Sequence, residues 1–297
     1  MELKKLDYDQ LAIVRPYFEV FNSEVSDINL TNLMMWRDKY QFYFIEIESF
    51  LFIVNIKGAH RYFSQPIGAY TDPKAVYKAV CVLKELCENE QKPLVIKKAN
   101  EAFVTLLNSY DMTFELKSSI DEQDYIYDFE ALKQLSGKKY HKKKNHINKF
   151  IRTYEDWRFK WYEASDLDSV DELLQVWLEV KKGNDMDPNL RFEYNGIMDV
   201  LKHRHYFDLK IGLIYVEGNI AGFIIGEVVN TSCLLVHIEK ADISYEGIFS
   251  MLGYTLYNEL DHLTFINREQ DLGIEGLRKS KLSYHPVKFI QKFELWF

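Results

Sequence analysis

The chain has 297 residues, of which 47% are hydrophobic, and a formal net charge of −8 at pH 7. This length allows one large or two ordinary domains, and the composition is that of a globular protein with a real core. Apolar runs such as AGFIIG are far too short to span a bilayer, and with only 6 prolines the chain is not expected to contain long disordered regions.

Signals for compartment and metal binding are sparse. The three cysteines, Cys81, Cys87 and Cys233, show no C-x-x-C pairing, which predicts buried free thiols. The odd cysteine count, with a start MELKKLDYDQ that has no apolar signal core, predicts a soluble cytoplasmic protein without a transmembrane segment. His203 and His205 form a pair without a third ligand, so we expect no metal site.

The first half of the chain alternates between helical and strand-like patterns. Apolar spacing predicts helices over 7–21, 29–40, 71–91 and 100–110, the third capped by Thr71 or Asp72 with Pro73 in its first turn. Aromatic and β-branched residues predict two strands within 41–56, joined near Glu48 and Ser49, and further strands over 93–99, 112–119 and 124–130.

The second half repeats this order. We expect a strand over 157–164, helices over 165–183 and 191–207, a hairpin over 209–230, a strand over 232–241, a helix over 244–260 and strands over 263–268 and 288–297. Mixed strands with helices predict an α/β (α+β layered) class with mixed, mostly antiparallel sheets. The order is that of the GCN5-related N-acetyltransferase fold, in two tandem copies. We expect an N-terminal domain over 1–130, a basic linker helix over 131–152 and a C-terminal domain over 153–297 that carries the site.

The linker is unusual for its charge. Seven of the 37 basic residues lie between Lys138 and Arg152 without any acidic residue, although the whole chain has 45 acidic residues. A charged run is usually a solvated helix face, but such helices normally mix signs because like charges repel. Uncompensated cations with interleaved Asn and His suit a phosphate-bearing ligand instead. The candidate anion-binding residues here are Lys139, Lys142, Lys143 and Asn145.

A second cluster of charge, 265–286, follows directly after a predicted strand. It contains Arg268, Glu269, Asp271, Arg278 and Lys281. One interpretation is a buried network of arginine and carboxylates that holds a turn. The functional interpretation has Arg278 and Lys281 bind phosphate or carboxylate, while Glu269 or Asp271 orients an amine or acts as general base.

One expected feature is missing. Acetyltransferases of this fold use a loop with repeated glycines, whose backbone N–H groups cradle the pyrophosphate of coenzyme A. The equivalent stretch EKADISYEGIFSML has a single glycine, Gly247, although Lys240 and the helix start near Ser244 could still hold a phosphate. Coenzyme A is therefore a possible but disfavoured cofactor, and no other cofactor is expected.

The two stretches YDFEALKQLSGKKYHKKKNHINKF and NREQDLGIEGLRKSKLSYHP resemble a bacterial family that shares the C-terminal catalytic domain of phosphatidylglycerol lysyltransferases. The resemblance implies a tandem acetyltransferase-like fold and transfer of an aminoacyl group from a charged tRNA to a lipid headgroup, a soluble amine or a hydroxyl acceptor. It also implies roles for the candidate residues. The basic set, Lys139, Lys142, Lys143 and Asn145, would grip the tRNA end or an acceptor phosphate; Arg268, Glu269 and Asp271, with Arg278 and Lys281, would line the transfer site.

Three functions stay open at this point. The first is aminoacyl transfer from tRNA, and the second is an acyl-CoA-dependent N-acyltransferase. The third is a non-catalytic protein that binds RNA or another anion on the same scaffold, for which binding would depend on salt without any product being formed.

Overall fold

The computed structural model describes residues 1–181 and 188–297, without the side chain of Lys181. The chain forms two compact units: residues 1–124 with 290–297, and residues 125–289. This division differs from the expected one in two ways. The basic segment 131–152 belongs to the second unit and is no separate linker, and the C-terminal residues 290–297 belong to the first.

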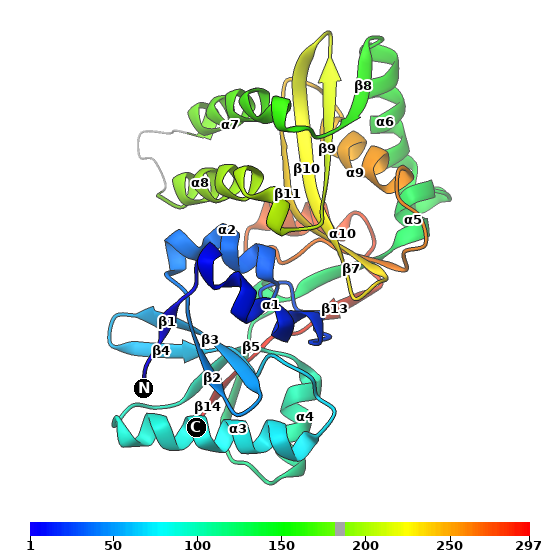
Figure 1. Cartoon of the computed structure of the whole chain (residues 1–297). Coiled ribbons are helices and arrows are strands. Elements are labelled where there is room, and N and C mark those ends of the chain that lie inside the picture. Colours follow the sequence, from blue (N-terminus) through cyan, green and yellow to red (C-terminus); the bar gives the residue numbers. More distant parts are fainter. Residues whose placement is uncertain (182–187) are drawn as a thin grey trace. The chain divides into compact units, whose positions relative to one another are not determined.

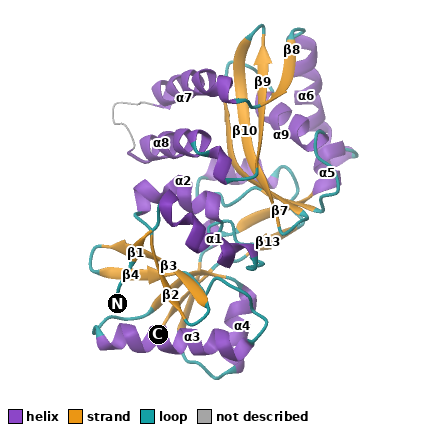
Figure 2. Ribbon diagram, in the orientation of Figure 1, coloured by secondary structure: helices purple, strands orange, loops and turns teal. Residues whose placement is uncertain are grey.

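The first unit contains a seven-stranded sheet (Figures 1 and 2). Its strands, in sheet order, are β1 (Lys4–Lys5), β2 (Tyr43–Ile47), β3 (Phe50–Lys57), β4 (His60–Phe63), β5 (Val95–Ala99), β14 (Phe293–Trp296) and β6 (Glu115–Ser118). β4 and β5 run parallel, and the other neighbours run antiparallel. The helices are α1 (Leu11–Glu19), α2 (Leu30–Tyr40), α3 (Pro73–Asn89) and α4 (Glu101–Ser109), with short 3-10 turns η1 (Tyr8–Gln10) and η2 (Ile120–Glu122).

Local sequence accounts for the long helix α3. Asp72 caps its N-terminus by accepting a hydrogen bond from the backbone N–H of Lys74, and Pro73 fits the first turn. One face is buried at helical spacing, at Val76, Ala79, Val80, Leu83 and Cys87. This stripe joins a core that β3, β5 and α4 share, so the predicted helix is confirmed.

The second unit contains the other seven-stranded sheet. Its strands, in sheet order, are β13 (Lys288–Ile290), β7 (Asp124–Asp128), β12 (Phe265–Asn267), β11 (Cys233–Ala241), β10 (Asn219–Val229), β9 (Leu209–Val216) and β8 (Trp157–Trp161). β11 and β12 run parallel, and β8 to β11 form an antiparallel meander. The helices are α5 (Phe129–Gln134), α6 (His141–Thr153), α7 (Leu167–Lys181), α8 (Pro188–Lys202), α9 (Ile248–Asn258) and α10 (Glu275–Leu282), with 3-10 turns η3 (Lys138–Tyr140), η4 (Ala164–Asp166) and η5 (Arg204–Tyr206).

Two mixed sheets with helices confirm the predicted fold class. Several details differ from the sequence prediction. The closing strand over 288–297 is two strands in different sheets, β13 and β14, and residues 275–282 form α10 where only a connection was expected. The expected linker helix is broken between α5 and η3, where Leu135 and Gly137 have left-handed backbone with φ of 48° and 88°. The predicted end of α7 at Gly183 lies outside the described residues.

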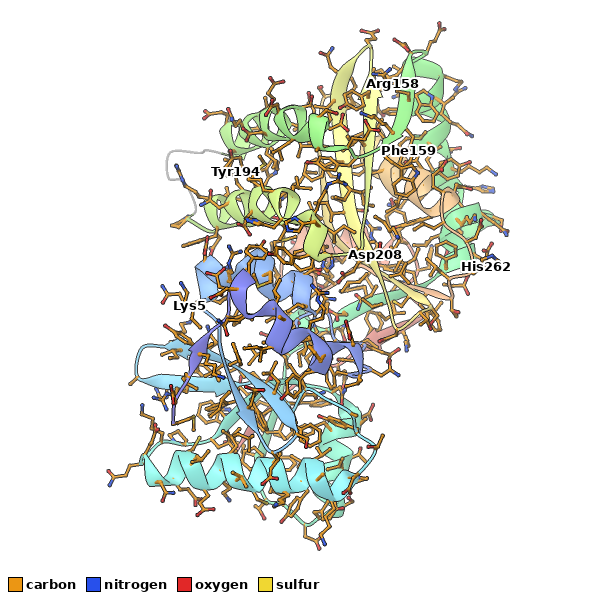
Figure 3. All side chains as sticks on the ribbon, viewed as in Figure 1. Lys5, Arg158, Phe159, Tyr194, Asp208 and His262 are labelled. Atoms are coloured by element: carbon orange, nitrogen blue, oxygen red, sulfur yellow. The ribbon has the colours of Figure 1, made fainter. Side chains whose placement is uncertain are left out.

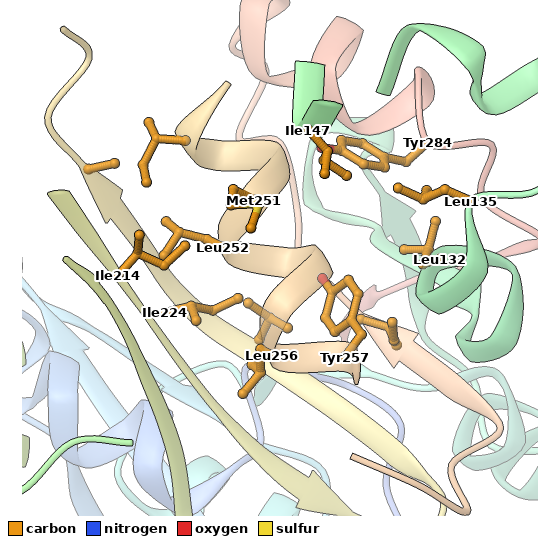
Figure 4. Close-up of a cluster of buried hydrophobic side chains, with 14 of the residues drawn as sticks. Leu132, Leu135, Ile147, Ile214, Ile224, Met251, Leu252, Leu256, Tyr257 and Tyr284 are labelled. Carbon is orange, nitrogen blue, oxygen red and sulfur yellow. The ribbon is translucent and has the colours of Figure 1, made fainter. Parts of the chain in front are cut away.

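The core of the second unit forms around α9. Figure 4 shows Leu252 and Leu256 of α9 beside Ile214 of β9 and Ile224 of β10, with Tyr257 on the same helix. Side chains fill the space around both sheets (Figure 3). This buried apolar surface fixes β11, β12 and α9, the elements from which the candidate site is built.

A buried lysine, Lys292, follows β13 and precedes β14 in the sequence, and it belongs to the first unit. Lys292 is fully buried, and its ammonium lies 2.6 Å from Asp124, pairs with Asp27 and donates to the Ser26 hydroxyl at 3.2 Å. Asp124 also accepts hydrogen bonds from the backbone N–H and the hydroxyl of Ser26, at 2.9 and 2.8 Å. Burial disfavours the ammonium, but the charges of Asp124 and Asp27 outweigh it and raise the pKa of Lys292.

We expect Lys292→Met to lower the free energy of unfolding by about 3–5 kcal/mol, because Asp124 would be left as a buried charge without its cation. Urea unfolding followed by circular dichroism measures this change. The matched control is Lys98→Met, since Lys98 is a partly exposed partner of the same Asp27 and should cost less than about 1 kcal/mol. Equal effects of the two substitutions would contradict the assignment of a buried ionic anchor.

Candidate functional site

The loop after β12 is held by a lysine of α10. Lys281 is buried, and its ammonium donates to the backbone carbonyls of Arg268, Glu269 and Gln270, at 3.0 Å for Glu269 and 2.7 Å for Gln270. Glu269 has a left-handed backbone with φ of 55°, which is rare for residues other than glycine. The ammonium thus stabilises a strained loop by satisfying three carbonyls. Lys281, predicted as a substrate ligand, is placed as a support of the site.

A second cation of α10 holds the next part of the loop. Arg278 donates to both carboxylate oxygens of Asp271, at 2.7 and 2.8 Å, and Asp271 also accepts from the Gly273 N–H and the Tyr125 hydroxyl. These hydrogen bonds, those of Arg278 above all, lower the pKa of Asp271 to about 2. Asp271 is fully buried, so it is an ion-paired structural carboxylate. Asp271 and Arg278 therefore form the arginine–carboxylate network that the sequence left as an alternative.

Glu269 points its carboxylate toward a histidine that the sequence did not single out. His237 of β11 lies between two carboxylates, 3.2 Å from Glu269 and 3.3 Å from Glu227 of β10. Burial disfavours a charged imidazole here, but the hydrogen bonds and charges of Glu227 and Glu269 outweigh it and raise the pKa of His237 to about 9. Glu269 is therefore held in place by an imidazolium.

The position of His237 follows from an irregularity of the sheet. Ile225 pairs with Ile238 and Gly226 pairs with Val236, so His237 is the extra residue of a β-bulge. Bulges frequently redirect a side chain beside an active site. No pattern in the sequence predicts this bulge, because it depends on strand pairing. A single histidine in an apolar strand does not by itself indicate a functional residue.

Arg268 belongs to a cluster of aromatic and charged groups. Its guanidinium pairs with Glu239 of β11 and lies 4.7 Å from the ring centre of Tyr284. Lys143 of α6 lies over the same ring, 3.7 Å from its centre. One carboxylate oxygen of Glu239 and the hydroxyl of Tyr257 are buried without a hydrogen-bond partner within 1–181 and 188–297. Arg268 and Lys143, predicted from distant stretches of sequence, are thus brought together.

The other basic residues lie on the surface of η3 and α6. Lys138, Lys139, Lys142 and Lys144 are exposed, and Lys149 pairs with Glu246 at 2.5 Å. No acidic residue lies in the first turn of α6, and no side chain caps the start of η3 or of α6. Cations at a helix N-terminus are opposed by the helix dipole. The lysines at this end are therefore better explained by a bound anion than by helix stability.

Asn145 and Lys240 make other contacts. Asn145 lies three residues after Lys142 on α6, where it lines an open hollow with Asn148, Ile151 and Arg152. Lys240 pairs with Glu193 of α8 at 2.8 Å and lies 3.7 Å from the ring centre of Trp177 of α7. These two contacts of Lys240, which was predicted to hold a phosphate near Ser244, are with α8 and α7.

Helix α6 packs against the start of α9. Gly247 has φ of +92°, and a β-carbon there would lie 2.6 Å from the His146 carbonyl oxygen, so only glycine fits this close approach. The Tyr154 hydroxyl accepts a hydrogen bond from the Glu246 N–H at 3.0 Å and contacts the Ser244 carbonyl at 3.4 Å. The end of α9 that cradles pyrophosphate in acetyltransferases thus makes contacts within the chain.

Comparison with known families identifies the relatives of this arrangement. The family model described as "Phosphatidylglycerol lysyltransferase, C-terminal" matches residues 18–295. The chain belongs to this family. The family supports a transferase of aminoacyl or acyl groups in general.

Similar proteins agree with the family assignment. A conserved protein of unknown function from Bacteroides thetaiotaomicron has a TM-score of 0.90 at 28% identity, over 100% of this chain and 99% of that one. L-PGS from Bacillus licheniformis has a TM-score of 0.70 at 14% identity, over 99% of this chain and 92% of that one, which confirms the tandem acetyltransferase-like fold. An uncharacterised protein of Mycoplasmoides gallisepticum is 27% identical over 195 residues, which are 63% of this chain and 59% of that relative.

The described residues contain neither a membrane-spanning helix nor a group of metal ligands. Within 1–181 and 188–297, no helix has the length and apolarity needed to cross a membrane. In the same part of the chain, His, Cys, Asp and Glu do not gather in any group of three suited to a metal ion.

Glu227 and Glu269 hold His237 between them as a carboxylate clamp, which can be tested directly. In imidazole NMR spectra, the titration of His237 should have its midpoint at about 9. Glu269→Gln should lower this midpoint because it removes one of the two charges that stabilise the imidazolium. Asp199→Asn is the control: Asp199 pairs with the half-exposed His203, so its replacement should leave the midpoint of His237 unchanged. A His237 midpoint that is the same in wild type and Glu269→Gln would contradict the clamp.

Proposed function

We propose that this chain transfers an aminoacyl group from a charged tRNA to a hydroxyl or amine acceptor. The observation that carries the proposal is the row of uncompensated lysines on η3 and α6 beside the cluster of Arg268, Glu239 and Tyr284. Exposed lysines without acidic neighbours suit the phosphates of an RNA end. Family membership supports acyl or aminoacyl transfer as the reaction.

The reaction needs few catalytic groups from the protein. An aminoacyl ester is already activated, so the site must orient two substrates, stabilise a developing oxyanion and accept a proton. We assign phosphate binding to Lys139 and Lys142. Arg268 supplies positive charge near the reacting carbonyl, and Glu269, fixed by His237, binds the α-ammonium of the aminoacyl group. The acceptor is a lipid headgroup or a soluble amine, and the transfer assay below separates the two.

The contacts at the start of α9 argue against an acyl-CoA donor. The Glu246 N–H is bonded to Tyr154, and the approach of His146 to Gly247 leaves no space for a side chain. A phosphate cradle needs backbone N–H groups open to the ligand. The proposal therefore uses tRNA phosphates, and no coenzyme A.

Replacing Lys139, Lys142 and Lys144 together by alanine should weaken binding of aminoacyl-tRNA by about tenfold or more. If three phosphate contacts are lost, the slope of log affinity against log salt should fall by about 2 to 3, because each contact releases counterions. Fluorescence anisotropy over a salt series measures both quantities. The matched control replaces Lys5, Lys57 and Lys74, three exposed lysines of the first unit, with the same change of net charge.

Transfer itself is tested with a pool of radiolabelled aminoacyl-tRNAs, offered with lipid vesicles or with a soluble extract as acceptor. Label should leave the tRNA with wild type and not with the triple variant. Binding without transfer to any acceptor would refute the enzyme and favour an RNA-binding protein. Equal binding by the two triple variants would refute the assignment of the basic row.

Coenzyme A and acetyl-CoA should leave the melting temperature of the protein unchanged, since a ligand that does not bind the folded state cannot stabilise it. Differential scanning fluorimetry over a concentration series checks this. A rise in melting temperature that saturates with acetyl-CoA concentration would overturn the tRNA donor in favour of an acyl-CoA-dependent N-acyltransferase.

A further inference from the structure

Lys143 differs from the other six cations of the basic segment. It is half-buried, whereas Lys138, Lys139, Lys142, Lys144, Lys149 and Arg152 are exposed. Its amine lies 3.7 Å from the ring centre of Tyr284, and no ion pair is found for it within the described residues. Lys149 of the same helix, by contrast, pairs with Glu246. The fold thus places one amine in an aromatic niche without a carboxylate of its own.

The groups around this amine favour its neutral form. From the end of β12, the guanidinium of Arg268 lies over the same tyrosine ring, 4.7 Å from its centre. From β11, Glu239 is the nearby carboxylate, but it pairs with Arg268. From η3, Lys139 lies four residues earlier in the chain and is a further, exposed cation. From α9, Ser250 and Tyr257 contribute hydroxyls, and Ser250 contacts the Tyr284 hydroxyl at 3.3 Å.

These surroundings have the expected effect on proton affinity. Burial, followed by the charge of Arg268, lowers the pKa of the Lys143 amine to about 8, and Glu239 opposes this only in part. The position in the first turns of α6 acts in the same direction, because the helix dipole disfavours a cation there. An amine with such a pKa is partly neutral near neutral pH. A general base is most effective when its pKa lies near the pH at which it works.

We propose that Lys143 is a catalytic residue, the base that takes the proton of the attacking hydroxyl or amine in the transfer reaction. This inference rests on the proposed function. The acceptor oxygen or nitrogen forms a bond to the aminoacyl carbonyl carbon, and its proton passes to the neutral amine of Lys143. The bond between that carbon and the 3′ oxygen of the tRNA then breaks. The Lys143 ammonium returns the proton to the departing oxygen, and the neutral amine is restored.

The surrounding geometry suits this role. Lys139, four residues earlier in the chain and exposed, can hold a phosphate next to the reacting atoms. The ring face of Tyr284 lies against the amine of Lys143 and limits its position by contact. The buried oxygen of Glu239 that has no partner within the described residues is a hydrogen-bond acceptor in the same cluster.

The test compares Lys143→Arg and Lys143→Ala with Lys149→Arg, an exposed lysine of the same helix that pairs with Glu246 and has no assigned role in binding. Lys143→Arg keeps the positive charge but cannot lose a proton, so the rate of transfer at saturating substrate should fall by about 100-fold or more. Lys149→Arg should change this rate by less than about threefold, because the positive charge beside Glu246 is kept on the surface of α6. Methylamine in the buffer should restore part of the activity of Lys143→Ala, since the small amine can fill the vacated niche.

A second measurement does not depend on activity. In protein whose lysines carry ¹³C-methyl groups, the signal that Lys143→Arg removes should titrate with a midpoint at about 8. The transfer rate of wild type should rise through the same pH range and lose this dependence in Lys143→Arg.

The outcomes separate the two proposals. If wild type transfers label and Lys143→Arg keeps the full rate and the same pH profile, Lys143 is not the base, while the proposed function stands. If Lys143 titrates as an ordinary lysine, the inference is also refuted. If wild type transfers nothing from any aminoacyl-tRNA, the proposed function fails, and the role of Lys143 fails with it.

Discussion

The buried pair of Lys292 and Asp124 joins the two places where the chain passes between its units. Asp124 is the last residue of the first segment, and Lys292 lies just after the chain returns. Through this return, β14 lies between β5 and β6, while β7 pairs with β12 in the other sheet. Two buried charges are costly unless they are paired and hydrogen-bonded, and the contacts with Ser26 and Asp27 meet that condition. Each sheet thus contains a strand from the other half of the sequence.

The same principle explains why several charged residues near β12 are supports. A charge that is buried must find partners, and α10 supplies them by turning Lys281 and Arg278 inward. These contacts fix the backbone of 268–273, which in turn places Glu269 against His237. Some charged residues of this loop therefore stabilise its backbone, and others remain available to a substrate. The partners of each side chain in the folded structure distinguish the two kinds.

The basic segment shows the opposite behaviour. The exposed lysines at its start, Lys138, Lys139, Lys142 and Lys144, gain nothing from the helix dipole, because they lie at the end where it is positive. No acidic residue in the first turn of α6 compensates them. Seven cations in a chain with an excess of acidic residues concentrate positive potential at one place on the second unit. A bound anion would supply the opposite charge, and this is the physical basis on which we propose a phosphate-bearing substrate.

The sequence by itself determined the mixed α/β class, most helices and strands, and the cationic character of 138–152, because periodicity and charge are local properties. It also placed Arg268 and Lys143 among the candidates. Only the tertiary structure decided that 288–297 divides between two sheets, since strand pairing is long-range. It likewise decided that Asp271, Arg278 and Lys281 support a loop, and that a bulge brings His237 to Glu269. Burial and the choice of partner depend on the folded chain, which brings together residues as far apart in sequence as Lys143 and Tyr284, and no local pattern encodes such a contact.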